Sequence, residues 1–446
     1  MTFGIGGFLM IFVTAYADFW KSKSLLVSIV IACYGAFTIP VYWLKDPTVN
    51  SFNSLIALYI VFGVFTFIEI ALTNIYIPHC MRLAENKAVH ERQENTVPDT
   101  GNEVIRDGKK QRYGFSMSVY GQLATSGSGS IMLAVVTILA GTLGGKFGQN
   151  AGLIVTTVFG FITVMGTVVC FLGLPVLPSK PLQRDSWKMA ILELLVPFQE
   201  LLLRKKNMLF LLAAYTIYTD TLFALASVTT QLFFTEIQPT TLEFSLYSMA
   251  GNLFSFAFTL AFFLFQSWAR WNMEKWLIFG YALILVIPIW GCIGLADVNF
   301  GFKNRWEFYV QNLIFYLSGA IVNPTWRLLY SDLVPKGEEV MWFGMQVIVS
   351  CATTWVSYVA TGPLQNATHN LRFPLIICLI FLMVPVVLEW CRASLGVFER
   401  DRLHWKQEEI GKERQERTFV ADAAFYRTSS EKGVSTPTSE IQAQKE

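Results

Sequence analysis

The sequence predicts an all-α integral membrane protein, and three features of its composition lead to that fold class. Of the 446 residues, 53% are hydrophobic and only 15% are charged, whereas a soluble domain has about 25% charged residues. The charges are also unevenly placed, because residues 80–116 and 399–446 hold 32 of the 66. This distribution excludes a soluble enzyme, a coiled coil and a disordered scaffold, and it indicates a chain that crosses a bilayer many times.

Eleven apolar stretches are long enough, or nearly so, to cross the bilayer as helices, which takes about 20 residues each. The expected spans are Phe3–Ala17, Leu25–Leu44, Asn53–Pro78, Met117–Gly141, Ala151–Pro175, Met208–Thr235, Phe244–Ser267, Trp276–Ala296, Phe308–Ser331, Met341–Leu364 and Phe373–Cys391. The first is short, and a cleaved signal peptide is an alternative for it, although no basic leader precedes it.

Other residue counts exclude several classes of partner and chemistry. A net charge of +2 gives no reason to expect nucleic acid as a partner. The seven cysteines form no C-x-x-C pair, so neither a disulfide framework nor a zinc site is expected. The four histidines lie outside the spans or at their edges, and no nucleophile motif is present. We therefore expect no metal, no cofactor and no enzymatic activity.

Lysine and arginine in the connections predict the orientation. One alternating set of connections carries 18 basic residues and the other carries five, and the positive-inside rule places the richer set in the cytosol. The tail after Cys391 falls on the same side. An odd number of spans then leaves Met1 on the far side, which favours a twelve-span protein whose first helix is absent from this chain.

With that helix added, the spans divide six and six about a middle segment, the architecture of a transporter with two parallel halves. The expected parts are an N-terminal transmembrane half at 1–175 with a cytosolic loop at 80–116, a cytosolic linker with an amphipathic helix at 176–207, a C-terminal transmembrane half at 208–393, and a largely disordered cytosolic tail at 394–446.

Several well-separated segments carry a family likeness. An acidic residue followed by basic residues stands after the first span, at Asp18–Lys23, and Asn74–Pro78 ends the third span. Leu212–Asp220 lies in the sixth span, and the most specific segments are Arg327–Glu339 and Thr368–Arg372. Together these residues resemble the autophagy-related vacuolar amino-acid effluxer family of fungi, within the major facilitator superfamily.

The resemblance implies a major-facilitator-type fold and a multi-pass protein of the vacuole membrane. It further implies export of neutral amino acids, such as leucine or tyrosine, from the vacuole lumen to the cytosol, linked to recycling after autophagy. An acidic lumen would allow coupling to protons through Asp220 or Glu69. Thr221 stands where the family has glycine, and Ala224 where it has threonine. A non-transporting or differently specific membrane sensor or scaffold of the same fold is therefore an alternative.

Four ionisable residues lie inside the expected spans, namely Glu69, Asp220, Arg327 and Glu389. A charge at the bilayer centre costs about 2.5–3.5 kcal/mol on insertion scales, so such residues usually face a cavity or a partner. Asp220 lies about 18 Å along its span, near the midplane. It is either a proton acceptor, a partner for a substrate ammonium, or a structural carboxylic acid. Glu69 is either a coupling residue or a structural acid, and Glu389 is expected to be a boundary residue.

Polar neighbours extend the candidate substrate site. The candidate substrate or coupling residues are Asp220, Tyr218, Tyr215, Glu69, Asn74, Asn323 and Arg327. Arg327 is either a gate or a carboxylate contact, or it is the structural partner of Asp332 or of a loop acid. Pro324, three residues before it, frees a backbone carbonyl inside the membrane.

Residues at the cytosolic helix ends are the candidates for gating. The resemblance implies that helix ends pair across the cytosolic mouth, and the gating candidates are Asp18, Lys21, Lys23 and Asp332. On the opposite side, Asn366 begins a glycosylation acceptor pattern, but we expect it in a loop too short for modification.

Overall fold

A computed structural model gives the arrangement of most of the chain. The described residues are 2–17, 20, 22–46, 48–93, 102–142, 150–175, 177, 198–203, 205–269, 271–296, 298–335 and 338–394. Most of the expected linker and almost all of the expected tail therefore lie outside the described residues. The chain separates into two compact units, Met1–Cys391 and Arg392–Glu446, and the helical bundle belongs to the first.

In the described residues, six helices build the first half of the bundle. They are α1 (Thr2–Ala17), α2 (Lys23–Thr38, continued by a 3-10 helix at Ile39–Leu44), α3 (Val49–Asn74), α4 (Tyr76–Gln93), α5 (Asn102–Thr142) and α7 (Ala151–Gly173). The Oγ atom of Ser22 caps α2 by accepting the Leu25 N–H at 3.3 Å. The stretch 80–116, expected as a loop, is helical over residues 80–93 and 102–116.

The part of the second half that the structure describes contains seven helices. They are α9 (Lys206–Leu232, continued by a π-helix at Phe233–Ile237), α10 (Thr241–Ala269), α11 (Met273–Ile284), α12 (Val286–Ile293), α13 (Arg305–Leu333), α14 (Glu339–Thr368) and α15 (Pro374–Ser394). Asn366 lies in the last turns of α14 rather than in a loop, because the helix continues past the apolar stretch that predicted its end.

All eleven expected spans coincide with helices, and the described residues form no strand. Nine helical segments of the described chain have the length and apolar composition to cross a membrane. The two other expected spans fall short for different reasons. Helix α1 is shorter, and α13 carries the amides Gln311, Asn312 and Asn323 among its apolar residues. The predicted fold class, an all-α membrane bundle, is confirmed.

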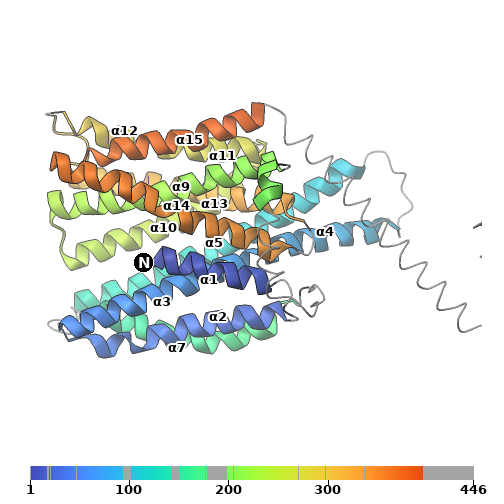
Figure 1. Cartoon of the computed structure of the whole chain (residues 1–446), viewed down its shortest axis with the longest axis horizontal. Coiled ribbons are helices and arrows are strands. Elements are labelled where there is room, and N and C mark those ends of the chain that lie inside the picture. The colour runs from blue at the N-terminus through green and yellow to red at the C-terminus, as the bar shows by residue number, and fades with distance from the viewer. Residues whose placement is uncertain are drawn as a thin grey trace, which may run out of the picture. The chain divides into compact units, whose positions relative to one another are not determined.

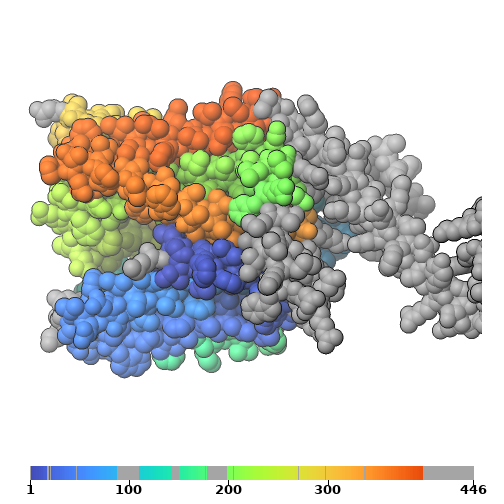
Figure 2. All heavy atoms as spheres, in the orientation of Figure 1, coloured from blue at the N-terminus to red at the C-terminus, as the bar shows by residue number. Residues whose placement is uncertain are grey.

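The most extensive packing between the halves is that of α5 along α10 and of α1 along α14, and α13 and α14 also contact α3, α4 and α5. Figure 1 shows α1, α2, α3 and α7 below the helices of the second half, and Figure 2 shows α1, in dark blue, directly against the orange α14. The Ser126 and Ser255 hydroxyls meet at 2.7 Å between α5 and α10. A methyl group on Gly344 would overlap Thr14, so the glycine allows α1 and α14 to pack closely.

Helix α9 lies at the centre of the second half. Of the candidate spans it has the largest share of buried residues, 61% in its most apolar window, and it packs on α13 and α14. A helix that is buried on most of its surface must satisfy its polar side chains within the protein. The polar residues of α9 therefore find their partners on α13 and α14, and these three helices hold most of the candidate site.

Candidate functional site

The centre of the site is the packed face between α9 and α13. Tyr215 of α9 stacks on Trp326 of α13, with ring centroids 3.8 Å apart and planes 11° from parallel. The Tyr215 hydroxyl donates to Asn323 Oδ1 at 3.3 Å, and Trp326 Nε1 donates to the Leu211 carbonyl at 3.3 Å. Asn323 keeps part of its surface exposed. These contacts hold the partly exposed Asn323 amide against a buried aromatic pair.

Tyr218, the second tyrosine predicted for the site, is packed away from solvent. Its side chain is completely buried, and its hydroxyl lies 2.9 Å from Ser318 Oγ. Ser318 donates to the Gly280 carbonyl of α11 at 2.8 Å, so the Tyr218 hydroxyl is the donor to Ser318. Tyr218 therefore links α9 to α13 and α11, and no solute reaches it in this conformation.

Glu69 and Arg327 form an electrostatic pair between the two halves. Glu69 lies on α3 in the first half and Arg327 lies on α13 in the second, and the Arg327 guanidinium acts electrostatically on the Glu69 carboxyl group. Both side chains are partly exposed. Asn323 and Arg327 are four residues apart on α13 and share one helix face. Three predicted residues, one acidic, one basic and one amide, are thus partly exposed, and the acidic one lies within electrostatic reach of the basic one.

Asp220 is almost completely buried, at 2% exposure, and its carboxylate faces three hydroxyls of α14. Thr354 Oγ1 lies 2.8 Å from Oδ1 and Ser350 Oγ lies 3.1 Å from the same oxygen, while Thr353 Oγ1 contacts Oδ2. Hydrogen bonds of this kind allow a buried carboxyl group to remain inside the bundle. Asp220 and the Glu69–Arg327 pair are therefore two separate polar sites.

Two predicted residues lie elsewhere. Asn74 is the last residue of α3 and is 7% exposed, so it belongs to the packed end of that helix. Glu389, expected at the membrane boundary, is fully buried in α15. Its nearness to the end of an apolar stretch predicted exposure, but the helix continues to Ser394 and buries it.

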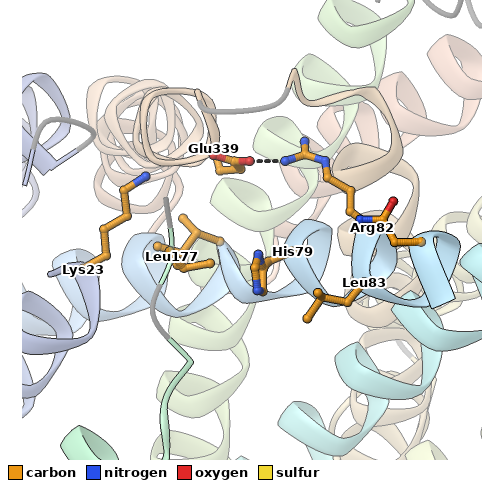
Figure 3. Close-up of a pocket in the computed structure, with 8 residues that line it drawn as sticks. Lys23, His79, Arg82, Leu83, Leu177 and Glu339 are labelled. Atoms are coloured by element: carbon orange, nitrogen blue, oxygen red, sulfur yellow. Dashed lines mark hydrogen bonds and ion pairs between the residues drawn. The ribbon is translucent and has the colours of Figure 1, made fainter. Parts of the chain in front are cut away.

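The cytosolic helix ends, named by the charge rule above, are joined across the halves. Arg82 of α4 forms an ion pair with Glu339 of α14 and donates to the Val334 carbonyl at 3.1 Å. Figure 3 shows this pair beside His79 and Lys23, which line the same pocket. Lys23, one of the gating candidates, is 2% exposed. The other two candidates of the α1–α2 connection, Asp18 and Lys21, lie outside the described residues.

A second ion pair crosses the same end of the bundle. Lys110 Nζ of α5 lies 3.0 Å from Asp332 Oδ1 of α13 and 3.9 Å from Glu85 Oε2 of α4. The predicted gating residue Asp332 therefore has a partner in the first half. We call the two pairs, Arg82–Glu339 and Lys110–Asp332, the cytosolic latch.

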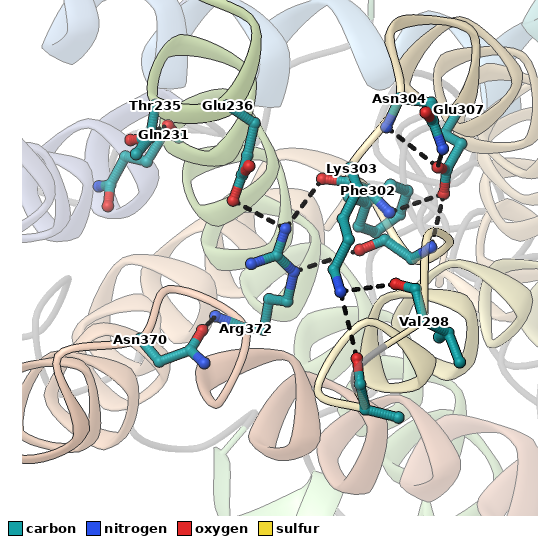
Figure 4. A network of polar contacts seen from close by, with 12 residues as sticks. Gln231, Thr235, Glu236, Val298, Phe302, Lys303, Asn304, Glu307, Asn370 and Arg372 are labelled. Carbon is teal, nitrogen blue, oxygen red and sulfur yellow. Dashed lines mark hydrogen bonds and ion pairs between the residues drawn. The ribbon is translucent and has the colours of Figure 1, made fainter.

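The opposite helix ends of the second half, which the charge rule places on the lumenal side, are held by one arginine. Arg372 follows α14, and its Nη2 lies 2.8 Å from Glu236 Oε1 at the end of α9. The same guanidinium donates to the carbonyls of Gly301 and Phe302, at 3.2 and 3.1 Å. Gly301 has a φ of +93°, a backbone conformation that favours glycine. Figure 4 shows these contacts converging from three connections.

Glu307, just before the apolar part of α13, completes this lumenal network. Its carboxylate accepts the backbone N–H groups of Gly301 and Phe302, each at 2.7 Å, and that of Asn304 at 3.0 Å. Asn304 Nδ2 also donates to it, at 2.7 Å. Burial alone would raise the pKa of Glu307, but these donors outweigh burial and hold the pKa below its usual range. We call Glu236, Arg372 and Glu307 with their partners the lumenal network.

The sequence reasoning did not name the α14 hydroxyls or the Arg82–Glu339 pair. A signal for the first was present, because Ser350, Thr353 and Thr354 stand at i, i+3 and i+4 within an apolar span and therefore share a helix face. The pair joins residues far apart in the chain, and no local pattern predicts it. Among the described residues, no group of three or more His, Cys, Asp or Glu side chains could hold a metal ion.

Comparison with known proteins confirms the family resemblance. A family described as "Vacuole effluxer Atg22 like" matches residues 1–393. Autophagy-related protein 22 of Candida albicans is 28% identical over 150 residues, which are 32% of this chain and 29% of that protein. Its counterpart in Saccharomyces cerevisiae S288c is 25% identical over 183 residues, 41% of this chain and 34% of that protein. The matched segments thus span about a third of these relatives.

Solved structures agree on the fold. The proton:xylose symporter XylE of the major facilitator superfamily superposes with a TM-score of 0.58 at 10% identity, over 87% of this chain and 84% of that one. The human organic anion transporter MFSD10 gives 0.54 at 12% identity, over 87% and 82%. The predicted major-facilitator-type architecture is therefore confirmed.

Proposed function

Because this chain belongs to the Atg22-like vacuole effluxer family, we propose that it is a secondary transporter that exports neutral amino acids, such as leucine or tyrosine, to the cytosol. Membership of the family and the multiple apolar helices place it in the vacuolar membrane as a multi-pass protein. The observation that carries the proposal is the Glu69–Arg327 pair, which sets opposite charges on partly exposed side chains of opposing halves.

A free amino acid matches this pair because it carries one charge of each sign. Its ammonium group would bind the Glu69 carboxylate, and its carboxylate would bind the planar guanidinium of Arg327 through two parallel hydrogen bonds. Arg327 and Glu69 would then exchange their mutual interaction for two interactions with the substrate. The stacked rings of Tyr215 and Trp326 are buried, at 9% and 1% exposure, and the Tyr215 hydroxyl holds the Asn323 amide one helical turn before Arg327.

The position of the pair also suits alternating access. In this fold the substrate site lies between the halves, and the two halves rock about it. A solute that bridges α3 and α13 interacts with both moving bodies, so its binding free energy depends on their relative position. The cytosolic latch closes one end of the interface in this conformation, which is the state that would take up solute from the lumen.

The proposal is tested by efflux from vesicles that carry the purified chain and are loaded with labelled leucine, tyrosine or one of a panel of other amino acids. We expect faster leucine or tyrosine loss than from empty vesicles. Glu69→Gln and Arg327→Gln should each lower this rate at least tenfold, because each removes one charge complementary to the substrate.

Matched substitutions at the exposed lumenal pair provide the control. Arg305 and Glu243 form an ion pair at 2.9 Å, with the arginine side chain 62% exposed, so Glu243→Gln and Arg305→Gln should leave efflux close to that of the unmodified chain. Efflux no faster than from empty vesicles for every amino acid of the panel would refute the proposal. Amino-acid binding without flux would instead favour the sensor or scaffold.

A further inference from the structure

We infer that Asp220 and the three facing hydroxyls of α14 form a reversible proton-binding site, separate from the Glu69–Arg327 pair. The inference rests on the proposed transport function in one respect, because it makes the proton the ion that drives amino-acid export. The reaction at the site is a protonation alone: a carboxylate oxygen of Asp220 takes up a proton from the lumenal side and later releases it to the cytosol.

The hydrogen bonds around Asp220 suit both protonation states. When the carboxylate is ionised, Ser350, Thr353 and Thr354 can each donate their single hydroxyl proton to it. Two of these hydroxyls have a second acceptor within reach. Thr353 Oγ1 lies 2.9 Å from the Val349 carbonyl, and Thr354 Oγ1 lies 2.6 Å from the Ser350 carbonyl.

When Asp220 is protonated, rotation of one threonine hydroxyl can therefore restore the hydrogen bonds of the site. The new carboxylic O–H donates to Thr353 or Thr354, and that threonine turns its own proton to the carbonyl four residues earlier in α14. No buried donor or acceptor loses its partner in either state, and such losses would cost about 1–3 kcal/mol each. A site with this property can gain and lose a proton without repacking the helices.

Burial and polarity favour a proton over a substrate ammonium or a metal cation as the ligand. Asp220 is 2% exposed and Thr354 has no exposed surface, whereas an ammonium group or a hydrated ion needs space. The surrounding side-chain groups are also hydroxyl donors already directed at the carboxylate, which leaves few free lone pairs for a cation. A proton needs no volume, and it can pass along hydroxyls and water.

The protonation state of Asp220 sets the net charge of this site, because the titratable groups that face it are not formally charged. On α14 the titratable neighbours are Cys351 and Tyr358, both of which interact electrostatically with Asp220, and both are neutral near pH 7. Within the expected spans, the formal charges on the helices packed nearby are those of Glu69 and Arg327. The other formal charges of α9, α13 and α14, which include Lys206, Glu307 and Glu339, lie toward the helix ends.

The decisive experiment measures how far a pH difference can concentrate leucine. In vesicles carrying the full chain, we expect a pH difference of one unit to sustain up to about a tenfold leucine ratio, since one proton moves with each leucine. Asp220→Asn, which resembles the protonated state in size and charge, should reduce the ratio to one and still exchange leucine for leucine. An unchanged ratio in Asp220→Asn would overturn the inference.

Variants of the hydroxyls separate a proton site from a merely structural aspartate. Thr353→Val and Thr354→Val remove donors to the ionised form, so each should move the midpoint of the pH profile to higher pH. Thr361→Val is the matched control on α14, because the Thr361 hydroxyl donates only to main-chain carbonyls, with Ser357 at 2.9 Å. Midpoints that do not move in Thr353→Val and Thr354→Val would contradict the inference.

Failure of the inference and failure of the transport proposal give different results. If leucine moves but responds to no pH difference, the proton site is wrong and the transport function stands. If no amino acid moves, infrared spectroscopy of the purified chain still reports the site. We expect a protonated-carboxyl C=O band that titrates with pH and is missing in Asp220→Asn, and a spectrum without such a band would overturn the inference.

Discussion

The two ends of the bundle are held together in different ways. At the cytosolic end, the latch pairs join the first half to the second, through Arg82 with Glu339 and Lys110 with Asp332. At the lumenal end, the ion pairs of the described residues stay within the second half, through Arg372 with Glu236 and Arg305 with Glu243. One end therefore binds two bodies to one another, and the other end stiffens a single body.

Because of this difference, removing a contact at one end should shift the conformational equilibrium, whereas removing a contact at the other end should lower the stability of the fold. A contact between halves exists in one state of a rocking transporter and is lost in the other, so its removal shifts the balance between the states. A contact within one half persists in both states, and its removal lowers the free energy of unfolding. Glu307 of the lumenal network has no exposed surface, so its contacts should be the most costly of all to break.

The largest expected effect on the free energy of unfolding follows from Glu307→Gln, which removes hydrogen-bond acceptors from the lumenal network. A glutamine offers one acceptor oxygen and turns an N–H₂ group toward the backbone donors, so we expect a loss of about 2–3 kcal/mol in the free energy of unfolding. Thermal unfolding of the chain in lipid nanodiscs measures it. Glu243→Gln, in the exposed pair, is the matched control and should cost less than about 1 kcal/mol.

The same variant should change the dependence of stability on pH. The pKa of Glu307 is lowered in the folded state, so its contribution is complete above the ordinary glutamate pKa and is lost as the pH falls through the folded value. We expect the unmodified chain to lose stability below about pH 4, and Glu307→Gln to lose less over that range. Parallel pH profiles for the two proteins would show that Glu307 is not the responsible group.

The next effect concerns the latch. Arg82→Gln removes the ion pair between Arg82 and Glu339, whose side chains are 22% and 10% exposed, so we expect the cytosol-closed state to lose about 1–2 kcal/mol. That corresponds to roughly a tenfold gain in cytosolic access. Cytosolic access is measured as the rate at which an impermeant maleimide alkylates a cysteine introduced by Ser331→Cys. Ser331 is buried at the cytosolic end of α13.

A charge exchange sharpens this test. The double variant Arg82→Glu with Glu339→Arg restores a pair of opposite charges and should recover much of the closed state, whereas either single change alone should open the cytosolic end. Arg305→Gln, which breaks an ion pair of the same kind within the second half, should leave the alkylation rate unchanged. Equal alkylation rates in the single and double variants would show that the Arg82–Glu339 ion pair does not stabilise the cytosol-closed state.

The sequence predicted the fold better than the geometry of the site. Apolar length and the placement of charge depend on local composition, so each expected span became a helix and the polar intramembrane residues were recognised as exceptional. The grouping of Glu69 with Arg327 and the isolation of Asp220 depend on how α3, α9, α13 and α14 pack. Such packing joins residues more than a hundred positions apart, so the residue pattern of a single helix cannot predict it.

Individual errors have equally specific causes. Tyr218 shares a helix with Asp220, and spacing alone could not show that its hydroxyl would be taken by Ser318. The hydropathy pattern predicted that the third span ends at Pro78, because the polar residues that follow lower the mean hydropathy. In the structure these polar residues belong to helix α4, which continues to Gln93. A polar helix that projects beyond the membrane has the composition of a loop and differs from it only in periodicity.

The smallest effect is expected from Lys110→Met. Its ammonium pairs with Asp332 at 3.0 Å but remains 22% exposed, so water replaces much of the interaction and about 0.5–1 kcal/mol should be lost. The Ser331→Cys probe should then react about two- to fivefold faster, and added salt should narrow the gap. Lys303→Met is the control, because Lys303 donates to the Ala296 and Val298 carbonyls within the second half. A larger effect for Lys303→Met than for Lys110→Met would mean that the lumenal network, and not only the latch, governs access from the cytosol.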